Sequence, residues 1–121
     1  MNKSFEYGTW VGEIRTEFEP KPGEIVATEH WCSSGFATTD LDLQLKKHGI
    51  HQLIVIGFIA YTCIEATVRF AAELGYEATV VRDATADYPD QEMHAALDIN
   101  MPNYASAVVT TTEIVDSISS L

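Results

Sequence analysis

The segment LIVIGFIAYTCIEATVRFAAELGYE, residues 53–77, changes its hydrophobic period part-way along. Residues 53–56 are all apolar and mostly β-branched, which predicts a strand buried on both faces, as in a parallel sheet. From Cys63 onward the apolar residues recur at helical spacing as far as Gly75, which suits the end of a helix. With Thr62 as the expected N-cap, the segment predicts a strand, a turn and a helix that holds Cys63 in its first turn.

Cys63 has two interpretations from spacing alone. The free N–H groups and positive end of a helix favour a thiolate in the first turn. A strand-to-helix turn also lies at the carboxyl edge of a parallel sheet, where α/β folds place their sites. A free cysteine, however, is commonly a small buried apolar residue. The pattern leaves both interpretations open.

Length and composition limit the class of protein. The chain has 121 residues, of which 46% are hydrophobic, so we expect one globular domain. Its formal charge of −11 argues against nucleic acid or an anionic membrane as partner. No apolar segment reaches membrane-spanning length, and no signal peptide is evident. Cys32 and Cys63 do not make a disulfide framework in a chain of this size, so we expect a cytoplasmic protein.

The remaining sequence divides into an arm and a domain. Residues 1–23 lack a sustained hydrophobic period, which predicts an irregular N-terminal arm. Its aromatic residues are expected to pack on the body or on a neighbouring chain; they are Phe5, Tyr7, Trp10 and Phe18. Strand and helix patterns then alternate through residues 24–121. This alternation predicts an α/β domain with a three-layer, Rossmann-like arrangement and a mostly parallel sheet.

The expected elements of this domain follow from local signals. The strands are predicted at residues 24–27, 53–56, 79–81 and 107–109. Helices are predicted after Thr39–Asp40, after Thr62, at 91–99 after Asp90, and after Thr110. Thr110 and Glu113 have the spacing of a capping box, which predicts a helix that continues to about Ser119.

Three stretches resemble the isochorismatase-like cysteine hydrolase family, which includes nicotinamidases and N-carbamoylsarcosine amidases. They are HWCSSGFATTDLDLQLKKHGI at residues 30–50, GFIAYTCIEATVRFAAELGYEATVVRDATA at 57–86, and MHAALDIN with VVTTTEIV at 93–100 and 108–115. The resemblance implies a truncated isochorismatase-like fold. It also implies hydrolysis of a C–N bond in a small amide or carbamoyl compound, with Cys63 as the nucleophile.

The resemblance implies roles for further residues. The amides of Ile59 and Cys63 would hold an oxyanion, after a cis peptide bond at Phe58–Ile59. His30 occupies the position of the family's catalytic lysine and would move protons near neutral pH. Asp83 matches a family aspartate that we expect to be structural, and His94 is expected to be a hydrogen-bonded helix residue.

The expected pocket and the absence of cofactors complete the predicted site. Aromatic residues would wall a small pocket near Cys63, unless they are ordinary core residues; they are Trp31, Phe36, Phe58 and Tyr61. Glu29, His30 and Cys32 lack the paired spacing of a zinc site, so no metal is expected. No glycine-rich phosphate loop is present, so no nucleotide cofactor is expected either.

Two departures from the family pattern predict a lower hydrolase activity. Nothing in residues 1–23 resembles the family strand that holds the catalytic aspartate, and His30 replaces the lysine. A cysteine hydrolase without its general base is expected to be impaired. Strand 53–56 would also keep an unpaired edge, which predicts a homodimer. The function is therefore a hydrolase, a non-catalytic binding or assembly protein, or one half of a split hydrolase.

Overall fold

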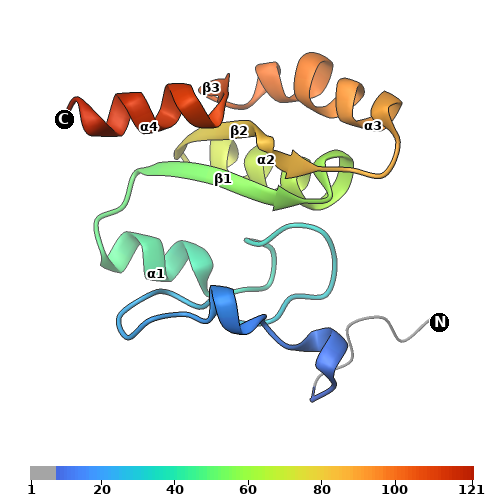
Figure 1. Cartoon of the computed structure of the whole chain (residues 1–121). Helices are drawn as coiled ribbons and strands as arrows, with labels where there is room; N and C mark the ends of the chain where they lie inside the picture. Colours follow the sequence, from blue (N-terminus) through green and yellow to red (C-terminus); the bar gives the residue numbers. More distant parts are fainter. Residues whose placement is uncertain (1–7) are drawn as a thin grey trace.

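The computed structural model describes residues 8–121, with Val11 as backbone only. The predictions for Phe5 and Tyr7 lie outside the described residues. Three parallel strands form one sheet in the order β1-β2-β3: β1 is Gln52–Phe58, β2 is Glu77–Ala86 and β3 is Ala107–Val109 (Figure 1). The predicted α/β class and parallel sheet are confirmed.

Residues 8–121 contain four α-helices (Figure 1): α1 at Leu41–Lys47, α2 at Glu65–Glu73, α3 at Asp90–His94 and α4 at Thr111–Ser119. Short π- and 3-10-helical segments lie at Trp10–Gly12, Thr16–Phe18, Ala60–Ile64, Ala95–Asn100 and Met101–Asn103. Helix α2 and the segment after α3 pack on one face of the sheet, and α4 contacts the other face. This is the three-layer arrangement that alternation of strands and helices predicts.

The core lies between α2 and the sheet. Val68 of α2, Val80 of β2 and Met101 are at most 1% exposed, and Phe36 and Tyr76 stack with ring centroids 5.6 Å apart. These side chains come from segments far apart in the sequence, so their burial fixes α2 and the loop before α1 against the sheet.

Two predicted helix ends are confirmed. Thr110 accepts a hydrogen bond from the Glu113 backbone N–H, and the Glu113 side chain accepts one from the Thr110 N–H, which completes the capping box of α4. Gly75 follows α2 with a φ of +88°, a conformation that favours glycine, and the next N–H, of Tyr76, donates to the Ala71 carbonyl.

The burial of β1 differs from the prediction. Its residues alternate between exposed and half-buried instead of being buried on both faces, because only the face with Leu53 and Val55 packs against the core. Ile54, Ile56 and Phe58 are 51%, 60% and 69% exposed. β1 is also an edge strand of the described sheet, so the unpaired apolar edge that the family resemblance predicts is present.

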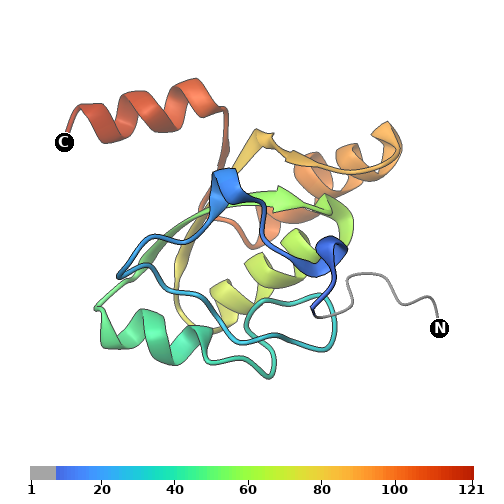
Figure 2. The ribbon, with the colours of Figure 1, turned by 60° about the horizontal axis from the view of Figure 1, so that its bottom comes forward.

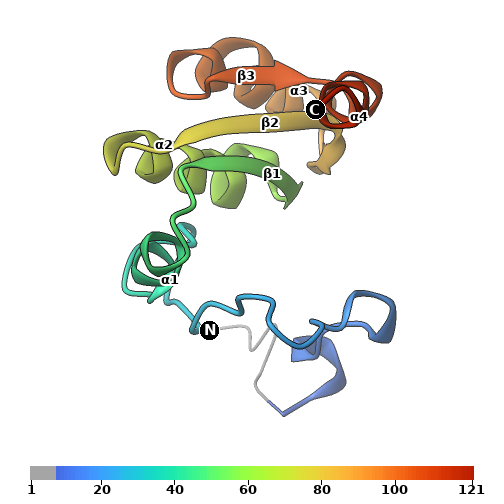
Figure 3. The same ribbon diagram turned by 90° about the vertical axis from the view of Figure 1, so that its left-hand side faces the viewer.

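The predicted strand at residues 24–27 is wrong. Within residues 8–121 this segment forms no ladder with another strand. The backbone next to residues 24–27 is held by side chains instead. The Thr28 N–H donates to Asp40 Oδ1, and the Asp40 N–H donates to Thr28 Oγ1. In Figure 3 this part of the chain and α1 lie beyond the β1 side of the sheet.

The described part of the arm, residues 8–23, is irregular apart from two 3-10 turns. Its aromatic side chains are not packed on the body, since Trp10 is 87% and Phe18 76% exposed. Figure 2 shows this segment passing in front of the sheet as a separate strip of chain. Packing of these residues on a neighbouring chain stays a prediction. None of the helices in residues 8–121 is long and apolar enough to cross a membrane.

Candidate active site

Cys63 lies in a helical turn that begins directly after β1. The turn is π-helical over Ala60–Ile64 and continues into α2, so Cys63 sits in the first part of one longer helical run. Thr62 is inside this turn and Ile59 is its N-cap, so the predicted N-cap at Thr62 is wrong. π-Helical turns inside helices are frequent at functional sites.

The hydrogen bonds of this turn leave the Cys63 amide out of the usual ladder. The Ile59 carbonyl accepts from the N–H groups of Thr62 (3.3 Å) and Ile64 (3.1 Å). In an α-helix the Cys63 N–H would be its donor. The peptide bond between Phe58 and Ile59 is cis, as the family resemblance predicts.

The thiol itself is half-buried. The Thr62 hydroxyl donates to Cys63 Sγ over 3.6 Å. Cys32, in contrast, is exposed and contacts the Ser33 hydroxyl at 3.7 Å. The two cysteines therefore occupy different surroundings, and only Cys63 lies at the carboxyl end of a strand.

Thr67 ties the Cys63 turn to the loop before α1. Its hydroxyl donates to the Cys63 carbonyl over 2.7 Å and accepts from the Gly35 N–H over 2.9 Å. The same loop contains His30 and Trp31 a few residues earlier. Thr67 thus fixes where this loop meets the Cys63 turn, a contact between residues 32 positions apart in sequence.

Asp87 bonds to the start of the turn that contains Cys63. Its Oδ2 accepts from the Tyr61 N–H over 2.7 Å, and its Oδ1 accepts from the Tyr88 N–H over 2.8 Å. An irregularity in the β1–β2 ladder precedes it, because Val55 pairs with Val80 whereas Gly57 pairs with Thr85. This bulge brings the end of β2 opposite Phe58, so that Asp87 reaches the start of the Cys63 turn.

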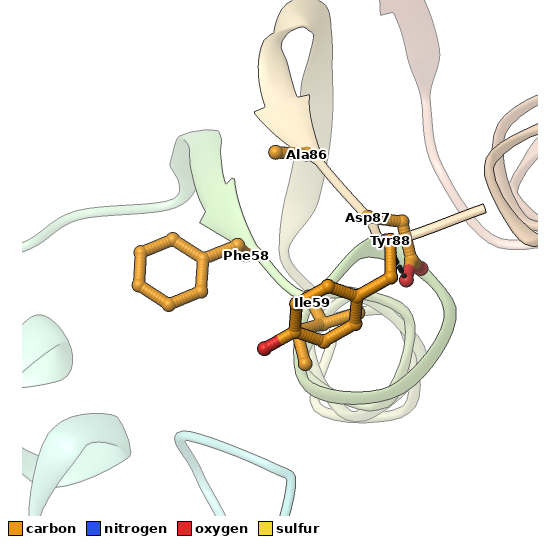
Figure 4. Close-up of a pocket in the computed structure, with 5 residues that line it drawn as sticks. All are labelled: Phe58, Ile59, Ala86, Asp87 and Tyr88. Atoms are coloured by element: carbon orange, nitrogen blue, oxygen red, sulfur yellow. Dashed lines mark hydrogen bonds between the residues drawn. The ribbon is translucent and has the colours of Figure 1, made fainter. Parts of the chain in front are cut away.

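A cavity of about 240 Å³ lies at the ends of β1 and β2. It is lined by Phe58, Ile59, Ala86, Asp87 and Tyr88 (Figure 4). In the figure the Tyr88 ring lies across Ile59, whereas Phe58 points away from the other side chains. Two of the predicted site residues, Phe58 and Ile59, therefore line one cavity next to the Cys63 turn.

The structure places the other predicted site residues in different surroundings. His30 is exposed and Trp31 is 90% exposed. Phe36 is 6% exposed and belongs to the core, which is the alternative that the sequence left open for these aromatics. Tyr61 lines a second cavity of about 410 Å³ with Thr62 and Glu65. A single aromatic pocket formed by all four residues is not what the described residues show.

The sequence patterns missed Thr67 and Asp87. Neither belongs to a recognisable motif, because each acts on the backbone of a residue distant in sequence. The one available signal for Thr67 was its position four residues after Cys63, which places both on the same side of a helix. No local signal identified Asp87.

Asp83 and His94 have structural contacts, as predicted. Asp83 Oδ1 accepts from the N–H and hydroxyl of Thr111, so it fixes the start of α4, and these bonds lower the pKa of the carboxyl. His94 Nδ1 lies 2.8 Å from Asp98 Oδ2, and Arg82 also bonds Asp98. The hydrogen bonds from His94 and then Arg82 lower the pKa of Asp98.

Metal-ligating residues do not gather at this site. In the part of the chain that the structure describes, no group of three or more His, Cys, Asp or Glu side chains is placed to hold a metal ion.

The fold is thus a parallel α/β sheet in which a half-buried cysteine lies in the helical turn after β1. Comparison with known proteins identifies the family: the isochorismatase domain model matches residues 1–114. The chain belongs to the isochorismatase family.

Individual relatives agree with this assignment. The chain is 39% identical over 83 residues to the secreted isochorismatase effector Isc1 of Verticillium dahliae, covering 69% of this chain and 43% of that protein. It is 30% identical over 118 residues to the ureidoacrylate amidohydrolase RutB of Pantoea ananatis, covering 98% of this chain and 47% of RutB. The chain thus spans about half the length of these relatives.

A solved structure has the same fold. The isochorismatase-like hydrolase from Alkaliphilus metalliredigens superposes with a TM-score of 0.82 at 26% identity. The match covers 91% of this chain and 60% of that one. The fold described above is therefore that of isochorismatase-like hydrolases, as the sequence stretches around Cys63 predicted.

Proposed function

We propose that this domain hydrolyses a C–N bond in a small amide or carbamoyl compound, with Cys63 as the nucleophile. The observation that supports it is the geometry of the Cys63 turn. A half-buried thiol stands beside an amide that the Ile59 carbonyl does not use. The name of the relative RutB, an amidohydrolase, is consistent with the same bond type.

The reaction would proceed in two steps. The Cys63 thiolate attacks the carbonyl carbon, so that a C–S bond forms and the carbonyl oxygen becomes negative. The amides of Ile59 and Cys63 are the proposed donors to this oxygen. The C–N bond then breaks, and the nitrogen leaves as ammonia or an amine after taking a proton. Water hydrolyses the thioester, which releases the acid and restores the thiol.

His30 is the proposed proton carrier. An imidazole is able to deliver a proton to the leaving nitrogen. Its loop is held to the Cys63 turn through the hydrogen bonds of Thr67 with Gly35 and with the Cys63 carbonyl. The substrate would enter the cavity lined by Phe58 and Ile59, whose volume of about 240 Å³ suits a small molecule.

Ammonia release under single-turnover conditions tests this function. The protein is held in excess over nicotinamide or an N-carbamoyl amino acid, so that slow turnover is still detected. We expect ammonia release that Cys63→Ser abolishes and Cys32→Ser, the matched control, retains. No release from either compound, or equal release by Cys63→Ser, would overturn the proposal.

We also propose that two copies of the chain associate through β1. The supporting observation is the free edge of β1 together with the exposure of Ile54, Ile56 and Phe58 on one face. Unpaired apolar edges are liabilities that native proteins cover. Two β1 edges related by a two-fold axis would pair antiparallel, which satisfies the free backbone groups of both strands and brings the two apolar rows side by side on one sheet face.

Light scattering at micromolar concentration tests this association. We expect the mass of a dimer for the natural chain. The change Ile56→Lys places a charge on the exposed face of β1 and should give monomers, whereas the control Val115→Lys on α4 should not. A monomer mass for the natural chain would contradict the proposal.

A further inference from the structure

Asp87 occupies an unusual place for a carboxylate, at the start of the helical turn that contains Cys63. Its Oδ2 accepts from the Tyr61 N–H over 2.7 Å, across 26 positions of sequence. Its other oxygen accepts from the Tyr88 N–H over 2.8 Å. Both carboxylate oxygens are thus bonded to backbone N–H groups, and Figure 4 shows the bond to Tyr88.

The turn offers few amides to a reacting oxygen. Of its N–H groups, that of Tyr61 donates to Asp87, and those of Thr62 and Ile64 donate to the Ile59 carbonyl. The Cys63 N–H lies between the last two and is passed over by this carbonyl. The hydrogen bond of Asp87 therefore helps to decide which amide of the turn faces an acyl group on the Cys63 sulfur.

We propose that Asp87 is a positioning residue for the Cys63 site, which holds the Tyr61 amide so that the Cys63 amide is directed to the acyl oxygen. This inference rests on the proposed function, since it assumes that Cys63 accepts an acyl group. Asp87 acts through the backbone and touches neither the sulfur nor the leaving group in this mechanism.

Two reactions of the same thiol separate this role from general structural damage. Acylation by p-nitrophenyl acetate passes through an oxyanion, whereas alkylation by iodoacetamide displaces iodide at a tetrahedral carbon and forms none. Both reactions consume the same thiolate. The ratio of the two rates at Cys63 therefore reports the oxyanion donors and is insensitive to the state of the thiol.

The variants are Asp87→Ala, which removes both hydrogen bonds, and Asp87→Asn, which keeps an acceptor for the Tyr61 N–H. Asp90→Ala is the matched control, because Asp90 is an exposed aspartate three residues further on. Label at Cys63 and Cys32 is counted separately by peptide mass, and a thermal melt verifies that each variant is folded.

We expect Asp87→Ala to lower the acylation-to-alkylation ratio at Cys63 by about tenfold or more, since a misplaced catalytic group costs up to about 10²-fold. Asp87→Asn should restore the ratio to within about threefold of the natural chain, and Asp90→Ala should leave it unchanged. The ratio at Cys32 should not move in any variant.

A ratio in folded Asp87→Ala within twofold of the natural chain would overturn the inference, as would an equal loss in Asp87→Asn and Asp87→Ala. If Asp87→Ala does not fold, Asp87→Asn alone still tests it, because a tenfold loss there contradicts the rescue. The proposed function fails separately, by the absence of ammonia release, while the ratio at Cys63 still depends on Asp87.

Discussion

The change Thr67→Val should release the loop before α1 from the Cys63 turn. Valine has nearly the shape of threonine but lacks the hydroxyl, so the packing around residue 67 is kept. Two hydrogen bonds are lost, one from the Gly35 N–H (2.9 Å) and one to the Cys63 carbonyl (2.7 Å). The Gly35 N–H is then left without its acceptor in a half-buried position.

The expected loss of stability follows from this unmet donor. A buried polar group without a partner costs about 1–3 kcal/mol, and half-burial favours the lower part of that range. We expect Thr67→Val to lower the free energy of unfolding by about 1–2 kcal/mol. Thr67→Ser keeps the hydroxyl and should lose less. Thr112→Val, an exposed threonine of α4, should stay within about 0.5 kcal/mol of the natural chain.

Urea unfolding followed by far-UV circular dichroism measures these differences, provided that the slope of the transition is the same in all variants. Ammonia release or acylation at Cys63 should fall in Thr67→Val as well, because the loop that contains His30 is no longer fixed. If Thr67→Val unfolds at the same urea concentration as Thr112→Val, the tether contributes nothing and this reasoning is wrong.

Other predictions concern the core, a helix cap and alkaline pH. Met101 is fully buried, so Met101→Ala should cost about 2–5 kcal/mol in the same urea assay, and an unchanged midpoint would contradict its place in the core. Thr110→Ala removes half of the capping box and should cost about 1 kcal/mol, with reduced hydrogen-exchange protection in the first turn of α4. Burial, and then the hydrogen bond to Asp42, raise the pKa of Tyr76 from 10.0 to about 12. The folded chain holds this proton more tightly than the unfolded chain. The resulting stability is therefore complete below pH 10 and is lost as the pH rises through 12. Over this window the urea midpoint should fall less in Tyr76→Phe than in the natural chain.

Local sequence signals predicted the elements that depend on local chemistry. Gly75 ends α2 and the Thr110–Glu113 pair starts α4, because each of these signals acts within one turn of its own helix. The stretches of family resemblance likewise located the turn that holds Cys63. These features need no knowledge of what packs against them.

The errors have a common physical cause, which is the dependence on distant partners. An apolar run such as residues 53–56 does not reveal whether other elements cover both of its faces, and here the face with Ile54 and Ile56 is left exposed. Residues 24–27 form no strand, because no neighbour among residues 8–121 pairs with them. Thr67 and Asp87 bond to backbone groups 32 and 26 positions away, so no local sequence pattern predicts these contacts.

The central claim is that Cys63 forms a covalent acyl intermediate with a small amide, and the mass of the quenched protein tests it most directly. Samples of the natural chain, Cys63→Ser and Cys32→Ser are mixed with the amide, quenched in acid within seconds to minutes, and measured intact and as peptides. The account predicts an acyl adduct on the peptide that contains Cys63 in the natural chain and in Cys32→Ser. An adduct on Cys32 alone, or its persistence in Cys63→Ser, would contradict it.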